Sequence, residues 1–186
     1  SPWLGAYATD FLLRAQRAGY AVPRQPMQQA YAALRRVARL NDFGSVRYEF
    51  EVYGWPGSND TTELLRSRAA AYALYVLAKA GEADIGQLRY FHDNRLANEP
   101  SPLARAQIAA ALAHMGDRAR ARNAFRLAEQ ALGYRNTGDW YQTPLRDLAG
   151  VLALAAEAGE TEMVDRLRRR LERDAPDAGE LMTQEK

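Results

Sequence analysis

Helix-start and helix-stop signals recur along the sequence and divide it into short segments. The starts place a hydroxyl residue at a capping position and a proline at the first helical position, as in Ser1-Pro2, Ser101-Pro102 and Thr143-Pro144. The stops place a glycine where a helix C-terminus favours a left-handed residue. They are Gly19, Gly81, Gly116 and Gly159. This punctuation predicts an all-α fold built from short helices.

Hydrophobic spacing within these limits predicts eight helices. They span residues 2–18, 26–40, 61–80, 84–95, 102–115, 118–131, 144–158 and 161–173. In the first helix an apolar face that includes Leu4, Tyr7 and Phe11 is expected to pack on the core. Asp10 and Arg14 take its other face. The third helix is apolar almost all round and is expected to be interior.

Composition limits the chain to a single globular unit, residues 1–186, with no expected membrane contact. Of its 186 residues 47% are hydrophobic, and no apolar run approaches the roughly 20 residues that cross a bilayer. The net charge is only +2, so nucleic acid is not expected as a partner. The absence of cysteine excludes a disulfide, a thiolate metal site and a cysteine nucleophile. A start at Ser1-Pro2-Trp3 is consistent with a fragment of a longer precursor.

One segment breaks the helical pattern. Apolar and charged residues alternate from Val46 to Val52, between Gly44 and the turn-forming residues 54–57. This pattern predicts a short strand or an extended aromatic loop inserted into the helical fold. A loop on a helical scaffold is where binding residues tend to lie. The same aromatic side chains would serve equally well to seal one end of the core, and both interpretations stay open.

Candidate catalytic residues are few. His92 and Asp93 are neighbours on a helix, where adjacent side chains point in different directions, so they are not expected to form an acid–base pair. His114 lies at a helix end, where exposed carbonyls favour a cation. The carboxylates available to an enzyme built on helical hairpins are Asp60, Glu63 and Asp139. Because nothing in the sequence pairs them, the chain is not expected to be an enzyme or to hold a cofactor or metal.

Several sequence blocks, in this order, are distinctive beyond their hydrophobic pattern. They are Trp3-Leu4-Gly5-Ala6-Tyr7, residues 10–15, 19–23, 71–78, 88–95 and 101–107, Thr143-Pro144-Leu145-Arg146-Asp147, and Thr183-Gln184-Glu185. Together they resemble the thioester domain of bacterial alpha-2-macroglobulins over nearly the whole chain. The resemblance implies part of an α/α toroid of helical hairpins, in which these eight helices supply four hairpins of six and the upstream, thioester-bearing helices are missing.

The resemblance also implies a function for the chain. Such proteins are broad-range inhibitors that trap attacking proteases, and this chain would be a non-catalytic scaffold portion of the thioester domain. The expected partners are the target proteases and other domains of the same parent chain. The expected location is the bacterial periplasm, with the parent lipid-anchored to the inner membrane. The reactive Cys-x-Glu-Gln motif lies upstream in the family, so no thioester residue belongs to this chain.

Position within the family gives the aromatic segment a possible role. Tyr48, Tyr53 and Trp55 are candidates for shielding the thioester from water, a role that stands beside simple packing. Family members that acylate hydroxyls use a histidine in this region, and residues 46–55 contain none. The parent protein is therefore expected to react with amines in preference to hydroxyls.

Two other functions remain open. Residues 104–116 and 119–125 are typical of helical-repeat hairpins, so a free-standing protein-interaction module is the first alternative. An enzyme on a helical toroid is the second. If the chain is a cut toroid, apolar helix faces on which the missing hairpins dock are expected to lie exposed.

Overall fold

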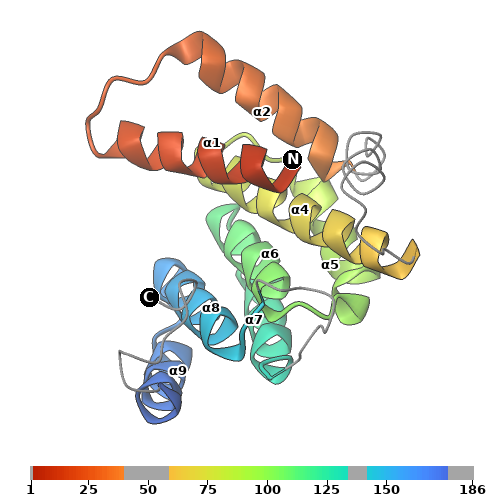
Figure 1. Ribbon diagram of the computed structural model, residues 1–186, viewed down its shortest axis with the longest axis vertical. Coiled ribbons are helices and arrows are strands. Elements are labelled where there is room, and N and C mark those ends of the chain that lie inside the picture. The colour runs from red at the N-terminus through yellow and green to blue at the C-terminus, as the bar shows by residue number, and fades with distance from the viewer. Residues whose placement is uncertain (1, 40–58, 134–141, 176–186) are drawn as a thin grey trace.

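The computed structural model describes residues 2–39, 59–133 and 142–175, and for residues 59–64 it describes the backbone alone. These residues form eight α-helices and one 3-10 turn (Figure 1). The elements are α1 (Pro2–Arg17), α2 (Arg24–Ala38), α4 (Asn59–Ala80), α5 (Ile85–Asn94), η1 (Leu96–Asn98), α6 (Pro102–His114), α7 (Arg118–Gln130), α8 (Pro144–Ala158) and α9 (Thr161–Asp174). Every predicted helix is confirmed, with ends that differ by at most two residues. The predicted strand or aromatic loop lies outside the described residues.

The capping signals act as the sequence predicts. The Ser101 hydroxyl accepts a hydrogen bond from the Ala104 N–H at the start of α6, and the Thr143 hydroxyl does the same for Arg146 in α8. Each thereby satisfies one of the N–H groups that a first turn leaves without a partner. At the other end of α8, Gly159 adopts a φ of 79°, a left-handed conformation that stops the helix.

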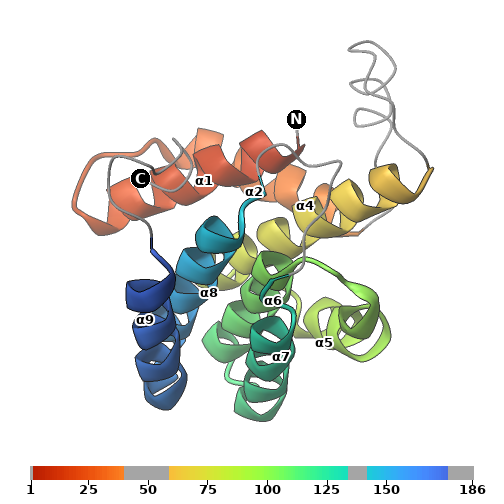
Figure 2. The ribbon, with the colours of Figure 1, turned by 60° about the horizontal axis from the view of Figure 1, so that its bottom comes forward.

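The helices form two layers (Figures 1 and 2). We call α1, α4, α6 and α8 the inner row, because each packs on the next in that order. The outer helices cover this row: α2 packs on α1 and α4, α5 and α7 on α6, and α9 on α8. An inner helix and an outer helix thus alternate four times along the chain, which is the arrangement expected of an α/α toroid.

The inner helices run parallel to one another. Trp3 near the start of α1 contacts Tyr72, whereas Asp10 further along contacts Lys79 at the end of α4. The ends of α6 and α8 also meet, because His114 contacts Glu157. The C-terminal ends of α4, α6 and α8 therefore lie close together, on the same side of the inner row.

The core lies in the middle of the inner row. Residues 69–78 of α4 are all buried, which confirms the prediction that this helix is interior. In α6, residues 106–113 are likewise buried, and alanine occupies five of the eight positions. Small side chains let neighbouring helices approach closely, and the larger Phe91 and Phe125 of the outer helices fill the remaining space.

The orientation of α1 differs from the sequence prediction. Its buried residues are Ala6, Thr9, Asp10 and Leu13. The apolar side chains predicted to face the core are instead exposed: Leu4 is 57% exposed, Tyr7 53% and Phe11 64%. The prediction for this helix was wrong, because the smaller face fits against α4 and places Asp10 beside a buried lysine.

Alanine substitutions at two helical glycines distinguish the effect of helix propensity on stability from the effect of packing. A Cβ at Gly5 would meet nothing within 4 Å, so Gly5→Ala is expected to raise the free energy of unfolding by about 0.5–1 kcal/mol. A Cβ at Gly150 would lie 2.7 Å from Leu103 Cδ1, where α6 and α8 approach, so the end of the half-buried Leu103 side chain would have to move. Gly150→Ala should therefore gain less stability than Gly5→Ala in urea denaturation, and equal stabilisation by both substitutions would contradict the close approach.

Candidate functional site

A buried ionic cluster joins the four inner helices. At its centre is Lys79 of α4, whose side chain is only 5% exposed. Its ammonium group donates hydrogen bonds to Asp10 Oδ1 of α1 at 3.0 Å and to the Tyr75 hydroxyl at 3.1 Å. Burying a lysine is costly unless its charge is paired, and Asp10 supplies the carboxylate.

The cluster continues through Tyr75 to α6 and α8. The Tyr75 hydroxyl lies 3.0 Å and 2.8 Å from the two carboxylate oxygens of Glu157 and donates to that group. His114 Nε2 lies 2.6 Å from Glu157 Oε1, and Lys79 Nζ lies 3.8 Å from Glu157 Oε2. We call Asp10, Tyr75, Lys79, His114 and Glu157 the inner-row network. It is buried at Asp10 and reaches solvent at His114 and Glu157.

Burial and hydrogen bonding both act on the titratable groups of this network. Burial raises the pKa of Tyr75, and its hydrogen bond to Glu157 raises it further. Burial alone would also raise the pKa of Glu157. The hydrogen bonds from His114 and Tyr75 and the charge of Lys79 outweigh that effect and lower the pKa of Glu157 to about 2. The network therefore holds Glu157 as a carboxylate at neutral pH.

Aromatic rings run from the surface of α1 to this network. Trp3 stacks on Tyr7 with ring centroids 5.6 Å apart, and Trp3 also meets Tyr72 at 5.8 Å. Tyr72 stacks on Tyr75 at 6.3 Å, and Tyr75 meets the His114 ring at 6.2 Å. The outer end of this row, at Trp3 and Tyr7, is exposed and the middle is buried. This series of aromatic rings links the exposed face of α1 to the ionic cluster.

A second polar cluster lies between α5 and α7. His92 Nδ1 lies 2.7 Å from Asp93 Oδ1, so the prediction that these neighbours do not pair was wrong. Asp93 sits at the last turn of α5, where its side chain reaches back to the ring. Hydrogen bonds from Arg120 and His92 lower the pKa of Asp93 to about 2. His92 Nε2 also contacts Asn123 of α7, so the cluster joins two outer helices and leaves no ring nitrogen for catalysis.

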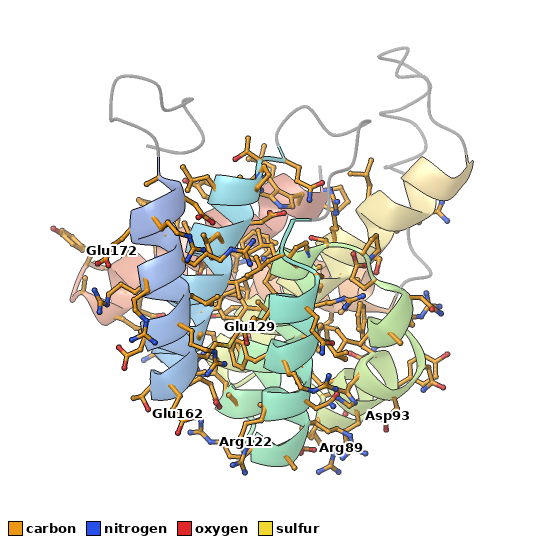
Figure 3. All side chains as sticks on the ribbon, turned by 90° about the horizontal axis from the view of Figure 1, so that it is seen from below. Arg89, Asp93, Arg122, Glu129, Glu162 and Glu172 are labelled. Atoms are coloured by element: carbon orange, nitrogen blue, oxygen red, sulfur yellow. The ribbon has the colours of Figure 1, made fainter. Side chains whose placement is uncertain are left out.

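Exposed ion pairs cover the outer helices. Figure 3 labels two of the acidic residues involved, Glu129 on α7 and Glu172 on α9, both of which are outer helices. Arg166 of α9 makes two hydrogen bonds to Glu129, and Arg168 pairs with Glu172 one turn later. The arginines of α9 are thus largely neutralised by nearby acids and form a solvated surface.

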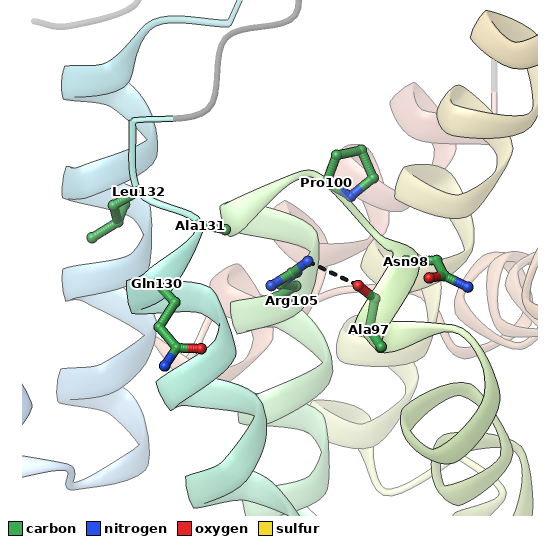
Figure 4. A pocket seen from close by; sticks show the side chains of 7 residues that line it. All are labelled: Ala97, Asn98, Pro100, Arg105, Gln130, Ala131 and Leu132. Atoms are coloured by element: carbon green, nitrogen blue, oxygen red, sulfur yellow. Dashed lines mark hydrogen bonds between the residues drawn. The ribbon is translucent and has the colours of Figure 1, made fainter.

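A cavity of about 490 Å³ lies between η1 and the C-terminal end of α7 (Figure 4). It is lined by Ala97, Asn98, Pro100, Arg105, Gln130, Ala131 and Leu132. Arg105 donates to the carbonyl oxygens of Leu127 at 2.9 Å and Ala97 at 3.2 Å, and also to that of Glu99. Its guanidinium group therefore holds the end of α7 against η1, which is a structural use of the charge.

Most of the residues that the sequence suggests for a function lie outside the residues that the structure describes. Tyr48, Tyr53, Trp55 and Asp139 lie beyond the described residues, as do the side chains of Asp60 and Glu63. The inner-row network was not predicted. The sequence does contain a signal for it, because Lys79 is the one charged residue in the otherwise uncharged stretch 69–80.

Among the described residues, no three His, Asp or Glu side chains are grouped as a metal site would require. Within the same part of the chain, no helix has both the length and the apolar character needed to cross a bilayer. The network is a set of mutually satisfied charges beside a row of aromatic rings. Such an arrangement fixes helix positions and offers no unpaired nucleophile.

Comparison with known proteins places the chain among bacterial relatives, although no protein-family model matches it. Alpha-2-macroglobulin of Escherichia coli K12 is 32% identical over 158 residues, which are 83% of this chain and 9% of that protein. The crystal structure of Salmonella alpha-2-macroglobulin reacted with methylamine is 34% identical and has a TM-score of 0.82, covering 100% of this chain and 12% of that one. The chain therefore spans about a tenth of the length of its relatives.

Two states of the E. coli protein match almost equally well. Native E. coli alpha-2-macroglobulin, in a structure from domain MG7 to the C-terminus, is 30% identical with a TM-score of 0.74, covering 98% of this chain and 28% of that one. The trypsin-activated protein is 30% identical with a TM-score of 0.75, covering 98% and 12%. The matching region lies within the C-terminal part of these proteins.

Loss of the central lysine should be far more costly than loss of a surface cation. Lys79→Met would leave Asp10 with only the largely exposed Arg14 as a partner. Breaking a buried pair costs about 3–5 kcal/mol of unfolding free energy when no partner remains, so this range is the upper bound here. Arg168→Met, which breaks an exposed pair, should cost no more than about 0.5 kcal/mol. Asp10→Asn combined with Lys79→Met should recover part of the loss in urea denaturation. Equal effects of Lys79→Met and Arg168→Met would exclude the network as a major source of stability.

Acid should weaken the fold partly through Glu157. Because the pKa of Glu157 is about 2 in the folded protein against an ordinary value of 4.5, its stabilising contribution is complete above pH 4.5. That contribution is lost as the pH falls from 4.5 toward 2. Glu157→Gln should therefore flatten the fall in unfolding free energy over this range. An unchanged slope in the variant would show that Glu157 does not carry this proton linkage.

Proposed function

Because the chain belongs to the bacterial alpha-2-macroglobulin family, a family of protease inhibitors, we propose that it is a non-catalytic scaffold portion of the thioester domain of such an inhibitor. The parent protein would trap attacking proteases, as the trypsin-activated and elastase-activated E. coli relatives suggest. Its location would be the bacterial periplasm, with a lipid anchor on another part of the parent. The domain would be a partial toroid completed by hairpins outside this chain.

The observation that carries this proposal is the inner-row network. It ties one side chain or more from each inner helix to a common buried charge, so the four hairpins would move together. The similar match to native and to trypsin-activated relatives supports a unit that keeps its internal arrangement while the whole inhibitor changes. A rigid support of this kind suits a domain that must hold a reactive group in place elsewhere.

The chemistry itself would come from outside the chain. A thioester requires a cysteine, and this chain has none. Its contribution would be protection, because an activated acyl group must be kept from water until it is needed. Tyr48, Tyr53 and Trp55 are proposed to provide part of that shield.

Mass spectrometry of the intact full-length protein before and after methylamine tests the proposal. We expect the mass to rise by one amine adduct and one new free thiol to appear. A parallel incubation with glycerol should add little, because residues 46–55 contain no histidine to relay the acyl group to a hydroxyl. No mass change with methylamine would contradict the thioester-domain role. A free-standing helical-repeat interaction module would then be the better description.

A further inference from the structure

The two basic residue types are distributed very unevenly in this chain. Of its 25 basic residues only two, Lys79 and Lys186, are lysine, and the other 23 are arginine. Lys186 lies outside the described residues. In the part of the chain that the structure describes, Lys79 is buried, whereas every arginine is exposed or partly exposed. Figure 3 labels two of these arginines, Arg89 on α5 and Arg122 on α7. The described surface therefore carries guanidinium groups and no lysine amine.

This allocation runs against the usual preferences of the two side chains. The ammonium group of lysine is compact and strongly hydrated, so lysine is usually exposed, and arginine is better suited to buried ion pairs. Here the buried cation of the inner-row network is the lysine, and arginine takes the surface. A bias in overall composition does not by itself explain why the one described lysine lies in the core.

The contacts of several surface arginines do not require a guanidinium group. Arg105 does require one, because its three nitrogens donate to three different carbonyl oxygens. Among the described residues Arg168 makes a single hydrogen bond, to Glu172 Oε1 at 2.6 Å, in an exposed pair. Arg122 likewise makes one, to the Arg118 carbonyl oxygen at 3.4 Å. A lysine ammonium group can make contacts of this kind.

Arginine and lysine differ in one property that matters to an amine-reactive protein. A thioester transfers its acyl group when the nitrogen lone pair of an amine attacks the carbonyl carbon. The C–N bond forms, the C–S bond breaks, and the proton of the amine ends on the sulfur. At pH 7 roughly one lysine in 2,500 is an uncharged amine, and the uncharged fraction of arginine is at least about a hundred-fold smaller. An exposed lysine is therefore an acyl acceptor, and an exposed arginine is not.

The one described lysine is withheld from such a reaction. The Lys79 side chain is only 5% exposed, and two of its three N–H groups donate to Asp10 and Tyr75. To attack an acyl group, Lys79 would have to leave both partners and lose a proton. Burial and charge pairing thus leave the described part of the chain without an accessible lysine amine.

We propose that the described surface uses arginine in place of lysine so that the acyl group of the parent protein finds no acceptor on its own thioester domain. The inference rests on the proposed function, because only a parent that reacts with amines needs such a surface. The acyl group would then remain available for the lysine side chains of a captured protease. Hydroxyl groups on the same surface are not expected to compete, since residues 46–55 contain no histidine.

Single lysines placed on this surface test the proposal. Arg168→Lys and Arg122→Lys in the full-length protein each keep the positive charge and add one exposed amine. Arg168→Gln and Arg122→Gln are the matched controls, because they change the same positions without adding an amine. Each protein is activated with elastase, which activates the E. coli relative, after the amines of the elastase have been dimethylated. Self-conjugates are quantified by gel electrophoresis under reducing conditions and located by peptide mass spectrometry.

We expect the two lysine variants to form several-fold more self-conjugate than the wild type or the glutamine controls, with the new amide at residue 168 or 122. Lys186 is present in every protein and supplies a common background. The same level of conjugation in every protein would overturn the proposal, and so would abundant self-conjugation of the wild type through other residues.

The methylamine mass shift, measured on the same samples, separates this proposal from the proposed function. A normal adduct without extra conjugate in the lysine variants would reject the protective role of arginine and leave the proposed function standing. A missing adduct in the wild type would reject both.

Discussion

The position of each inner helix depends on one buried cation. Lys79 lies in the middle of four helices, and its charge would be prohibitively costly there without Asp10, Tyr75 and Glu157 around it. Pairing the charge of Lys79 requires α1, α4 and α8 to hold fixed positions along their axes. His114 brings in α6 through its contact with Glu157. Small alanine side chains give little control over register, and the hydrogen bonds of the network add contacts that favour the one observed.

The ends of the inner helices are organised by the same requirement. Three helix C-termini gather near the network, and each presents carbonyl oxygens that attract positive charge. Arg17 donates to the carbonyl of Lys79, and Arg118 donates to that of Ala158 at 2.8 Å. Arg17 and Arg118 thus pair with carbonyl oxygens at helix ends, while Lys79 serves the cluster. A scaffold results in which charge fixes the geometry and the alanine-rich core supplies close packing.

Local signals were enough to predict the helices, whereas their orientation required tertiary information. Ser101 and Thr143 act as caps because a hydroxyl satisfies nearby N–H groups whatever surrounds the helix. The face of α1 was assigned wrongly because spacing shows that an apolar stripe exists and cannot show what covers it. Asp10 was placed on the solvent side for the same reason, since its partner Lys79 is 69 residues away. The contact between His92 and Asp93 depends on side-chain rotamers at a helix end, which the spacing rule does not contain.

Hydrogen exchange of the full-length protein before and after methylamine treatment is the most direct test of a rigid inner row. Residues 69–78 of α4 and 106–113 of α6 are buried, and these two stretches lead to Lys79 and His114 of the network. If the network holds the row as one body, their exchange should be equally slow in both states. Faster exchange in these two segments after methylamine treatment would contradict the account, because it would show that the inner helices separate.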